Sequence, residues 1–120
     1  MKTKLNIIKQ KFMDKYCLDN EQANKNLVFC EFNDKIYVGL SLCDSGLQDQ
    51  NFYFYDAEKV DDFCTPPIAQ IKFMTDNKPA MFIRRLEFVD FSYKGKGYAS
   101  KFMQSFEAYC INNNFNHIFG

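Results

Sequence analysis

The residues best suited to chemistry lie in the segment 94–101, which reads KGKGYASK. Glycine has no Cβ, so Gly95 and Gly97 can take positive φ and let a ligand approach the backbone closely. A helix is predicted to follow directly, and its first turn offers unpaired N–H groups and the positive end of the helix dipole. Together with Lys94, Lys96 and Lys101, these N–H groups favour an anion site suited to a pyrophosphate.

Two common nucleotide-binding loops do not fit this segment. The P-loop pattern GxxxxGK[ST] is absent from the chain. A dinucleotide-binding fold places its glycines in the first strand–helix unit, whereas this loop follows several predicted strands. The position of the loop therefore argues against both folds.

The elements that position the loop can be read from the flanking residues. Ala80–Val89 is predicted to be a long strand, Tyr98–Asn112 a helix and Phe115–Phe119 a buried strand. The helix presents one apolar face, made by Ala99, Phe102, Met103, Phe106, Tyr109 and Cys110. The order strand, helix, strand predicts a βαβ unit whose two strands are parallel.

Antiparallel structure is predicted upstream of this unit. Residues 4–17 have the apolar spacing of an amphipathic helix. Two apolar runs, Leu27–Phe32 and Ile36–Leu42, flank the turn-forming pair Asn33-Asp34 and so predict a β-hairpin.

Three further elements are expected before the βαβ unit. Asn51–Tyr55 and Ile68–Met74 are predicted strands, and Ala57–Phe63 is a predicted short helix. The turn Asp76–Pro79 makes the strand before it antiparallel to Ala80–Val89. The expected fold class is α/β with a mixed sheet, antiparallel strands followed by a βαβ unit, in one domain spanning residues 1–120.

Composition excludes several partners. The formal net charge is zero, so no overall basic field for nucleic acid is predicted. No apolar run approaches membrane-spanning length, and residues 1–11 lack the apolar core of a signal peptide. We therefore expect no nucleic-acid partner and no membrane partner. The cysteines, read as reduced thiols, add the expectation of a cytoplasmic location.

The cysteines are interpreted as reduced residues of the core. There are 5 of them, with no CxxC pair and only 1 histidine in the chain, so no metal site is predicted. A nucleophilic cysteine paired with His117 stays open as an alternative, although His117 is more simply a hydrogen-bonded strand residue. The aromatic run Phe52–Tyr55 is interpreted as a buried strand, and lining of an acceptor pocket is the alternative.

The segment Lys94–Ala99 resembles the pattern [Arg/Gln]-x-x-Gly-x-[Gly/Ala] of the GCN5-related N-acetyltransferases (GNAT family), with Lys in the first position. The resemblance extends over residues 80–119. It implies a GNAT-like acyl-CoA N-acyltransferase fold and acetyl-CoA as co-substrate, with no metal. The implied reaction is direct transfer of the acetyl group to a primary amine of a small molecule, peptide or protein within a ternary complex.

The resemblance also implies roles for individual residues. The CoA pyrophosphate would be held by backbone N–H groups of the loop, with Ser100 at the helix start: Lys94, Gly95, Lys96, Gly97, Tyr98, Ala99 and Ser100. The pantetheine arm would pair with backbone groups near Phe88, Val89 and Asp90, one N–H of which would polarise the thioester carbonyl.

Acetyl transfer requires a neutral amine, so a carboxylate is expected to accept its proton. Glu87 is the first catalytic candidate and Asp90 the second, while a solvated strand residue is the simpler interpretation of Glu87. Family domains continue past the fifth strand with a helix and two strands, whereas this sequence stops at Gly120. A fragment, a shortened member and a homodimer that covers the last strand are all consistent with this, and a non-catalytic CoA-binding or protein-interaction module is the alternative function.

Overall fold

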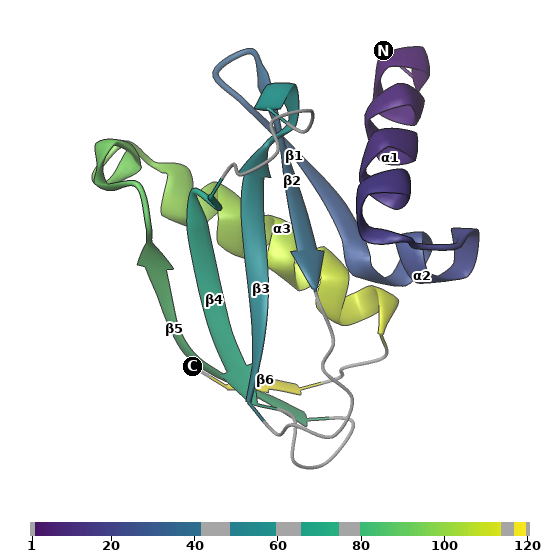
Figure 1. Cartoon of the computed structure of the whole chain (residues 1–120). Coiled ribbons are helices and arrows are strands. Elements are labelled where there is room, and N and C mark those ends of the chain that lie inside the picture. The colour runs from purple at the N-terminus through teal and green to yellow at the C-terminus, as the bar shows by residue number, and fades with distance from the viewer. Residues whose placement is uncertain (1, 42–48, 60–65, 75–79, 114–116, 120) are drawn as a thin grey trace.

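The computed structural model describes residues 2–41, 49–59, 66–74, 80–113 and 117–119. Its centre is a six-stranded sheet in which the strands lie in chain order (Figure 1). The strands are β1 (Leu27–Phe32), β2 (Lys35–Ser41), β3 (Asp49–Asp56), β4 (Ala69–Met74), β5 (Ala80–Phe88) and β6 (His117–Phe119). Neighbours from β1 to β5 are antiparallel, whereas β6 is parallel to β5. The predicted mixed α/β class is confirmed.

Beside the sheet, the described residues form the α-helices α1 (Lys2–Tyr16), α2 (Asn20–Asn26) and α3 (Tyr98–Asn112). Two short 3₁₀ helices, η1 (Ala57–Lys59) and η2 (Phe91–Tyr93), follow β3 and β5. In Figure 1, α3 crosses one face of the sheet, while α1 and α2 lie at the end formed by β1. No helix in the described ranges is long and apolar enough to cross a membrane.

The main core lies between α3 and one face of the sheet. Residues alternate sides along a strand, so every second residue of each strand points to α3. Phe54 stacks on Phe102 with 4.3 Å between the ring centroids, and Phe52 contacts Phe106 at 5.2 Å. The buried members of this core include Val28, Cys30, Tyr37, Phe52, Phe54, Ile71, Phe73, Phe102, Phe106 and Cys110.

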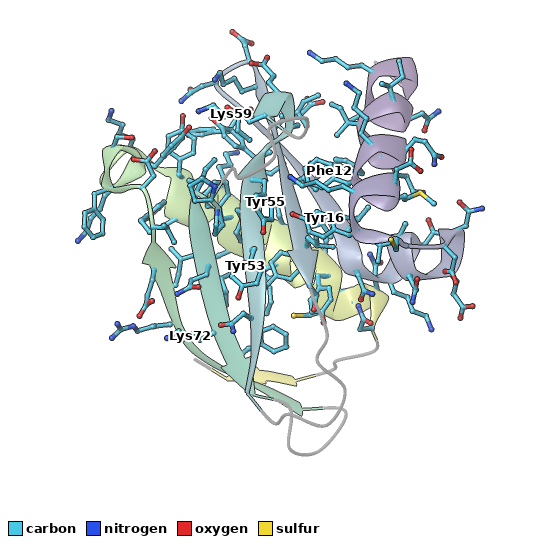
Figure 2. The ribbon with its side chains drawn as sticks, viewed as in Figure 1. Phe12, Tyr16, Tyr53, Tyr55, Lys59 and Lys72 are labelled. Carbon is cyan, nitrogen blue, oxygen red and sulfur yellow. The ribbon has the colours of Figure 1, made fainter. Side chains whose placement is uncertain are left out.

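A second core lies on the opposite face and is smaller. There α1 and α2 cover β1, β2 and part of β3, and Phe12 of α1 packs against Tyr55 of β3 with centroids 6.2 Å apart. Over β4 and β5, this face carries no helix of the described chain (Figures 1 and 2). Among the described residues, one half of this face is therefore covered and the other half is open.

Most of the predicted elements are present. The hairpin turns at Asn33 and Asp34, which have φ of 54° and 62°. The expected helix Ala57–Phe63 is described only as the 3₁₀ helix η1, and residues 60–63 lie outside the described chain, as does the predicted turn Asp76–Pro79. The helix α2 was not predicted, because Ala23 is its one buried residue and its sequence has no apolar period.

Candidate functional site

The loop between β5 and α3 turns at its two glycines. Gly95 has φ of 78° and Gly97 has φ of 86°, conformations that cost a residue with a Cβ about 1–2 kcal/mol. Residues 94–97 are exposed, and Gly97 is the N-cap of α3 without a side chain to cap it. Both glycines thus adopt the positive φ that was predicted from their residue type.

The backbone N–H groups of this loop are largely free. No hydrogen bond links the N–H groups of residues 95–100 to an acceptor within the described residues. The N–H of Lys94 is different, because it donates to the carbonyl of Phe91 at 3.0 Å and is not available for a ligand. Of the predicted pyrophosphate donors, Lys94 therefore has its N–H bonded within the chain, and the role of the set in binding a pyrophosphate stays a prediction.

Aromatic contacts hold the loop in place. The ring of Tyr98 packs edge-on against Phe32 of β1, with centroids 4.8 Å apart, and its hydroxyl lies 3.2 Å from that of Tyr37. Asn33, in the hairpin turn, donates to the same Tyr98 hydroxyl at 3.5 Å. A Cβ on Gly97 would lie 3.5 Å from the Phe32 ring. The β1–β2 turn therefore fixes the start of α3.

Positive charge surrounds the free N–H groups. The ammonium group of Lys94 lies 5.9 Å from the centre of the Phe91 ring, and that of Lys101 lies 5.8 Å from the Phe32 ring. Lys96 is exposed between the two glycines. These cations add to the dipole of α3 at the place where an anion would bind.

The strand that leads into the loop has an irregular register and an open edge. Lys72 pairs with Arg85 while Phe73 pairs with Ile83, so Arg84 is an extra residue that forms a β-bulge in β5. β6 pairs only with residues 80–82 of β5. From Ile83 to Phe88, the edge of β5 on the β6 side has no strand partner in the part of the chain that is described.

Such an edge can accept an extended ligand as an additional strand. The N–H groups of Val89 and Asp90 do not contribute, because both donate to the carbonyl of Ile68, at 2.8 and 3.0 Å. The N–H expected to polarise a thioester was placed near Phe88, Val89 and Asp90, and these two bonds leave Phe88 as the candidate among the three. N–H groups alternate sides along a strand, so the N–H of Phe88 is directed away from β4 and toward the open edge.

Glu87 lies on the sheet face opposite α3, where β4 and β5 are uncovered. Its carboxylate accepts a hydrogen bond from Gln70 Nε2 at 2.9 Å and forms an ion pair with Arg85. The hydrogen bonds from Gln70 and Arg85 hold the pKa of Glu87 below its ordinary value. The group is therefore ionised at neutral pH, but it is a weaker base than a free carboxylate.

Asp90 has a structural role at the start of the loop. One oxygen of its carboxylate accepts from the backbone N–H of Ser92 at 3.0 Å and from the Ser92 hydroxyl at 2.6 Å. These bonds lower the pKa of Asp90. Its carboxylate caps η2 and thereby orients the turn that precedes Gly95.

Sequence reasoning missed a buried charge near this site. Asp56 at the end of β3 is buried and accepts from the ammonium group of Lys35 at 3.3 Å. A hollow of about 80 Å³ adjoins Asp56 and is also lined by Lys59, Asp90 and Tyr93. The pair Asp56 and Lys59 is far in the sequence from the pair Asp90 and Tyr93, so no local pattern could have brought the two pairs together.

Other predicted residues fall into the core or outside the described chain. Phe52 and Phe54 face α3, whereas Tyr53 and Tyr55 point to the opposite face, so the aromatic run is a buried strand with a partly covered reverse face, as expected. Cys30, Cys110 and Cys17 are free thiols. Cys30 and Cys110 are buried as predicted, whereas Cys17 is exposed, so the prediction of a core position is wrong for Cys17. The side chain of His117 is not among those described, and neither are Cys43 and Cys64.

Within the described residues, no group of three or more His, Cys, Asp or Glu side chains is arranged to hold a metal ion. The loop and the end of β5 carry backbone amides, lysines and two carboxylates. Comparison of the chain with family models, with curated proteins and with solved structures finds no match.

Proposed function

We propose that this chain binds acetyl-CoA at the β5–α3 loop and transfers its acetyl group to a primary amine, as a GNAT-type N-acetyltransferase. One observation carries the proposal: the open edge of β5 leads directly into a loop whose N–H groups from residue 95 to 100 have no acceptor in the described chain. A ligand with an amide-bearing arm and a pyrophosphate end matches both features, because the arm can pair with the edge and the pyrophosphate with the loop.

The reaction would be a direct displacement. The pantetheine arm would lie along the open edge, near the N–H of Phe88, and place the thioester beside the uncovered sheet face. The amine nitrogen would attack the carbonyl carbon, the C–S bond would break, and the electron pair would leave on the sulfur of CoA. Glu87 would accept the proton that the amine loses, directly or through water, and the thiolate of CoA takes up a proton from solvent.

A second function is favoured by the hydrogen bonds of Glu87. Two bonds to the carboxylate stabilise its anionic form and make it a weak proton acceptor. A module that binds CoA without catalysis would need the loop but no base. Acetyl-CoA binding together with an absence of thiol release for a broad panel of amines would support this module over the enzyme.

The proposal is tested by isothermal titration with acetyl-CoA, for which we expect a dissociation constant in the micromolar range. Gly97→Val should abolish binding, because a branched side chain at positive φ is strained and would press on the Phe32 ring, which moves the loop. Lys96→Glu reverses a charge at an exposed position without backbone strain and should weaken binding. Lys25→Glu, an equal charge change on α2, is the matched control.

Circular dichroism shows whether Gly97→Val still folds. If it folds and binds acetyl-CoA as the parent does, and Lys96→Glu is also without effect, the loop is not the site. Release of free CoA thiol with amines added then separates transfer from binding.

A further inference from the structure

Two positive side chains lie side by side on the open half of the sheet. Lys72 of β4 and Arg85 of β5 are direct cross-strand partners, and both are exposed. Neighbouring strands are about 4.8 Å apart, so like charges in direct register repel one another. This arrangement destabilises the sheet unless negative charge lies close by.

The chain supplies only part of that negative charge. Glu87 forms an ion pair with Arg85 and accepts a hydrogen bond from Gln70. Its single negative charge is therefore already paired with Arg85. Lys72 has no salt bridge and no hydrogen bond to any residue that the structure describes. The charge of Lys72 also helps to lower the pKa of Glu87, so a single carboxylate faces two cations and a second negative charge from outside would complete the balance.

The surroundings of the two cations suit a small organic molecule. Figure 2 shows Tyr53 and Lys72 on the sheet face that is turned away from α3. Tyr53 is half-buried. It lies opposite Gln70 of β4, and Gln70 lies opposite Glu87 of β5. A row of aromatic ring, amide and carboxylate thus runs beside the pair of cations and ends next to the open edge of β5.

We propose that the acceptor is a small primary amine that also carries a carboxylate or phosphate group. The anionic group binds between Lys72 and Arg85, the carbon chain lies over the sheet beside Gln70, and the amine lies at Glu87. This inference rests on the proposed acetyl transfer and adds the chemical class of the acceptor. Arg85 and Glu87 are two residues apart on one strand, roughly 6–7 Å, so a few bonds separate the anionic group from the amine.

The test compares acceptors that differ only in the anionic group. The probes are 4-aminobutyrate and 3-aminopropyl phosphate, each compared with butylamine, which has no negative charge. We expect KM values for thiol release to be lower with the two anionic amines. Lys72→Met should raise those values about threefold to fivefold, as loss of one exposed ion pair does, and leave butylamine unchanged. Lys25→Met removes the same charge from α2 and should change nothing.

Binding without chemistry is measured in parallel by titrating each amine into the ¹⁵N-labelled protein. Chemical shift changes at Lys72 and Arg85 for the anionic amines alone, together with their lower KM values, support the inference. The same shift changes without any transfer would show an anion site and would overturn its role as the acceptor site. Equal KM values for the anionic amines and butylamine, unchanged by Lys72→Met, would overturn it while the transfer proposal stands. Absence of both binding and transfer would overturn both.

Discussion

The hydroxyl oxygens of Tyr37 and Tyr98 are hydrogen-bonded at 3.2 Å in the interior of the protein. Tyr37 lies in the middle of β2 and is fully buried, and Tyr98 is the first residue of α3. Burial and the bond to Tyr98 raise the pKa of Tyr37, whereas the bonds from Tyr37 and Asn33 lower that of Tyr98. The sheet is thereby attached to the helix at the residue that follows the glycine loop.

Tyr98→Phe is expected to leave the Tyr37 hydroxyl buried without its acceptor. Such a group costs about 1–3 kcal/mol of unfolding free energy, whereas removing both hydroxyls costs less than the sum of the single losses. Urea unfolding of Tyr37→Phe, Tyr98→Phe and the double variant measures this coupling. If the two single losses simply add, the hydroxyls do not stabilise one another.

Gly39→Ala should destabilise the sheet, although alanine is small. A Cβ at Gly39 would lie 2.8 Å from Cζ of Phe52 and 2.9 Å from Cγ2 of Val28, and Phe52 is fully buried. Overpacking of this kind costs about 1–3 kcal/mol, to be measured by thermal unfolding. Phe52→Leu removes the outer ring atoms, so it should cost less in the Gly39→Ala background than alone. An unchanged Tm for Gly39→Ala would contradict the packing described.

Asp90 can be tested as a cap or as a base with two substitutions. Asp90→Asn keeps an oxygen that can accept from Ser92, but its amide cannot act as a base. Asp90→Ala removes both the acceptor and the base. We expect Asp90→Asn to retain acetyl transfer and Asp90→Ala to lose about 0.5–2 kcal/mol of stability, the usual cost of a lost cap. Transfer assays and urea unfolding give the two results, and equal loss of transfer in both variants would make Asp90 the base.

Glu87→Gln should leave acetyl-CoA binding unchanged and reduce acetyl transfer. It should also change how stability depends on pH. The pKa of Glu87 is lowered in the folded protein, so its stabilising contribution is present above the unfolded-state value of about 4.3 and is lost as pH falls through the folded value. Unfolding in urea at several pH values should show the parent and the variant diverging at neutral pH and converging in acid. A gap of constant size would contradict the role of the ion pair.

The elements that were predicted correctly are those with a local signal. The hairpin follows from Asn33 and Asp34 between two apolar runs, and the bounds of α3 match the prediction Tyr98–Asn112. α2 has a local signal that was overlooked, a capping box in which Asp19 and Gln22 bond each other's backbone N–H. Such a signal could have located the helix where hydrophobic periodicity could not.

The candidate site was predictable only where it depends on the chain's local conformation. The positive φ of Gly95 and Gly97 follows from residue type. By contrast, the hydrogen bonds that the N–H groups of Val89 and Asp90 donate to Ile68 depend on pairing with a distant strand. The extra residue Arg84 likewise appears only in the register between β4 and β5. Pairing between distant segments depends on the whole sheet, so the sequence pattern of one segment does not predict it.

The order of the strands has a consequence for how the protein is made. Each strand from β2 onward pairs with the strand that immediately precedes it in the chain. A ribosome releases the N-terminal part first, so every new strand meets a partner that has already emerged. Only β6 must wait for α3 to form, and assembly during synthesis can therefore proceed hairpin by hairpin, with short loop closures at each step.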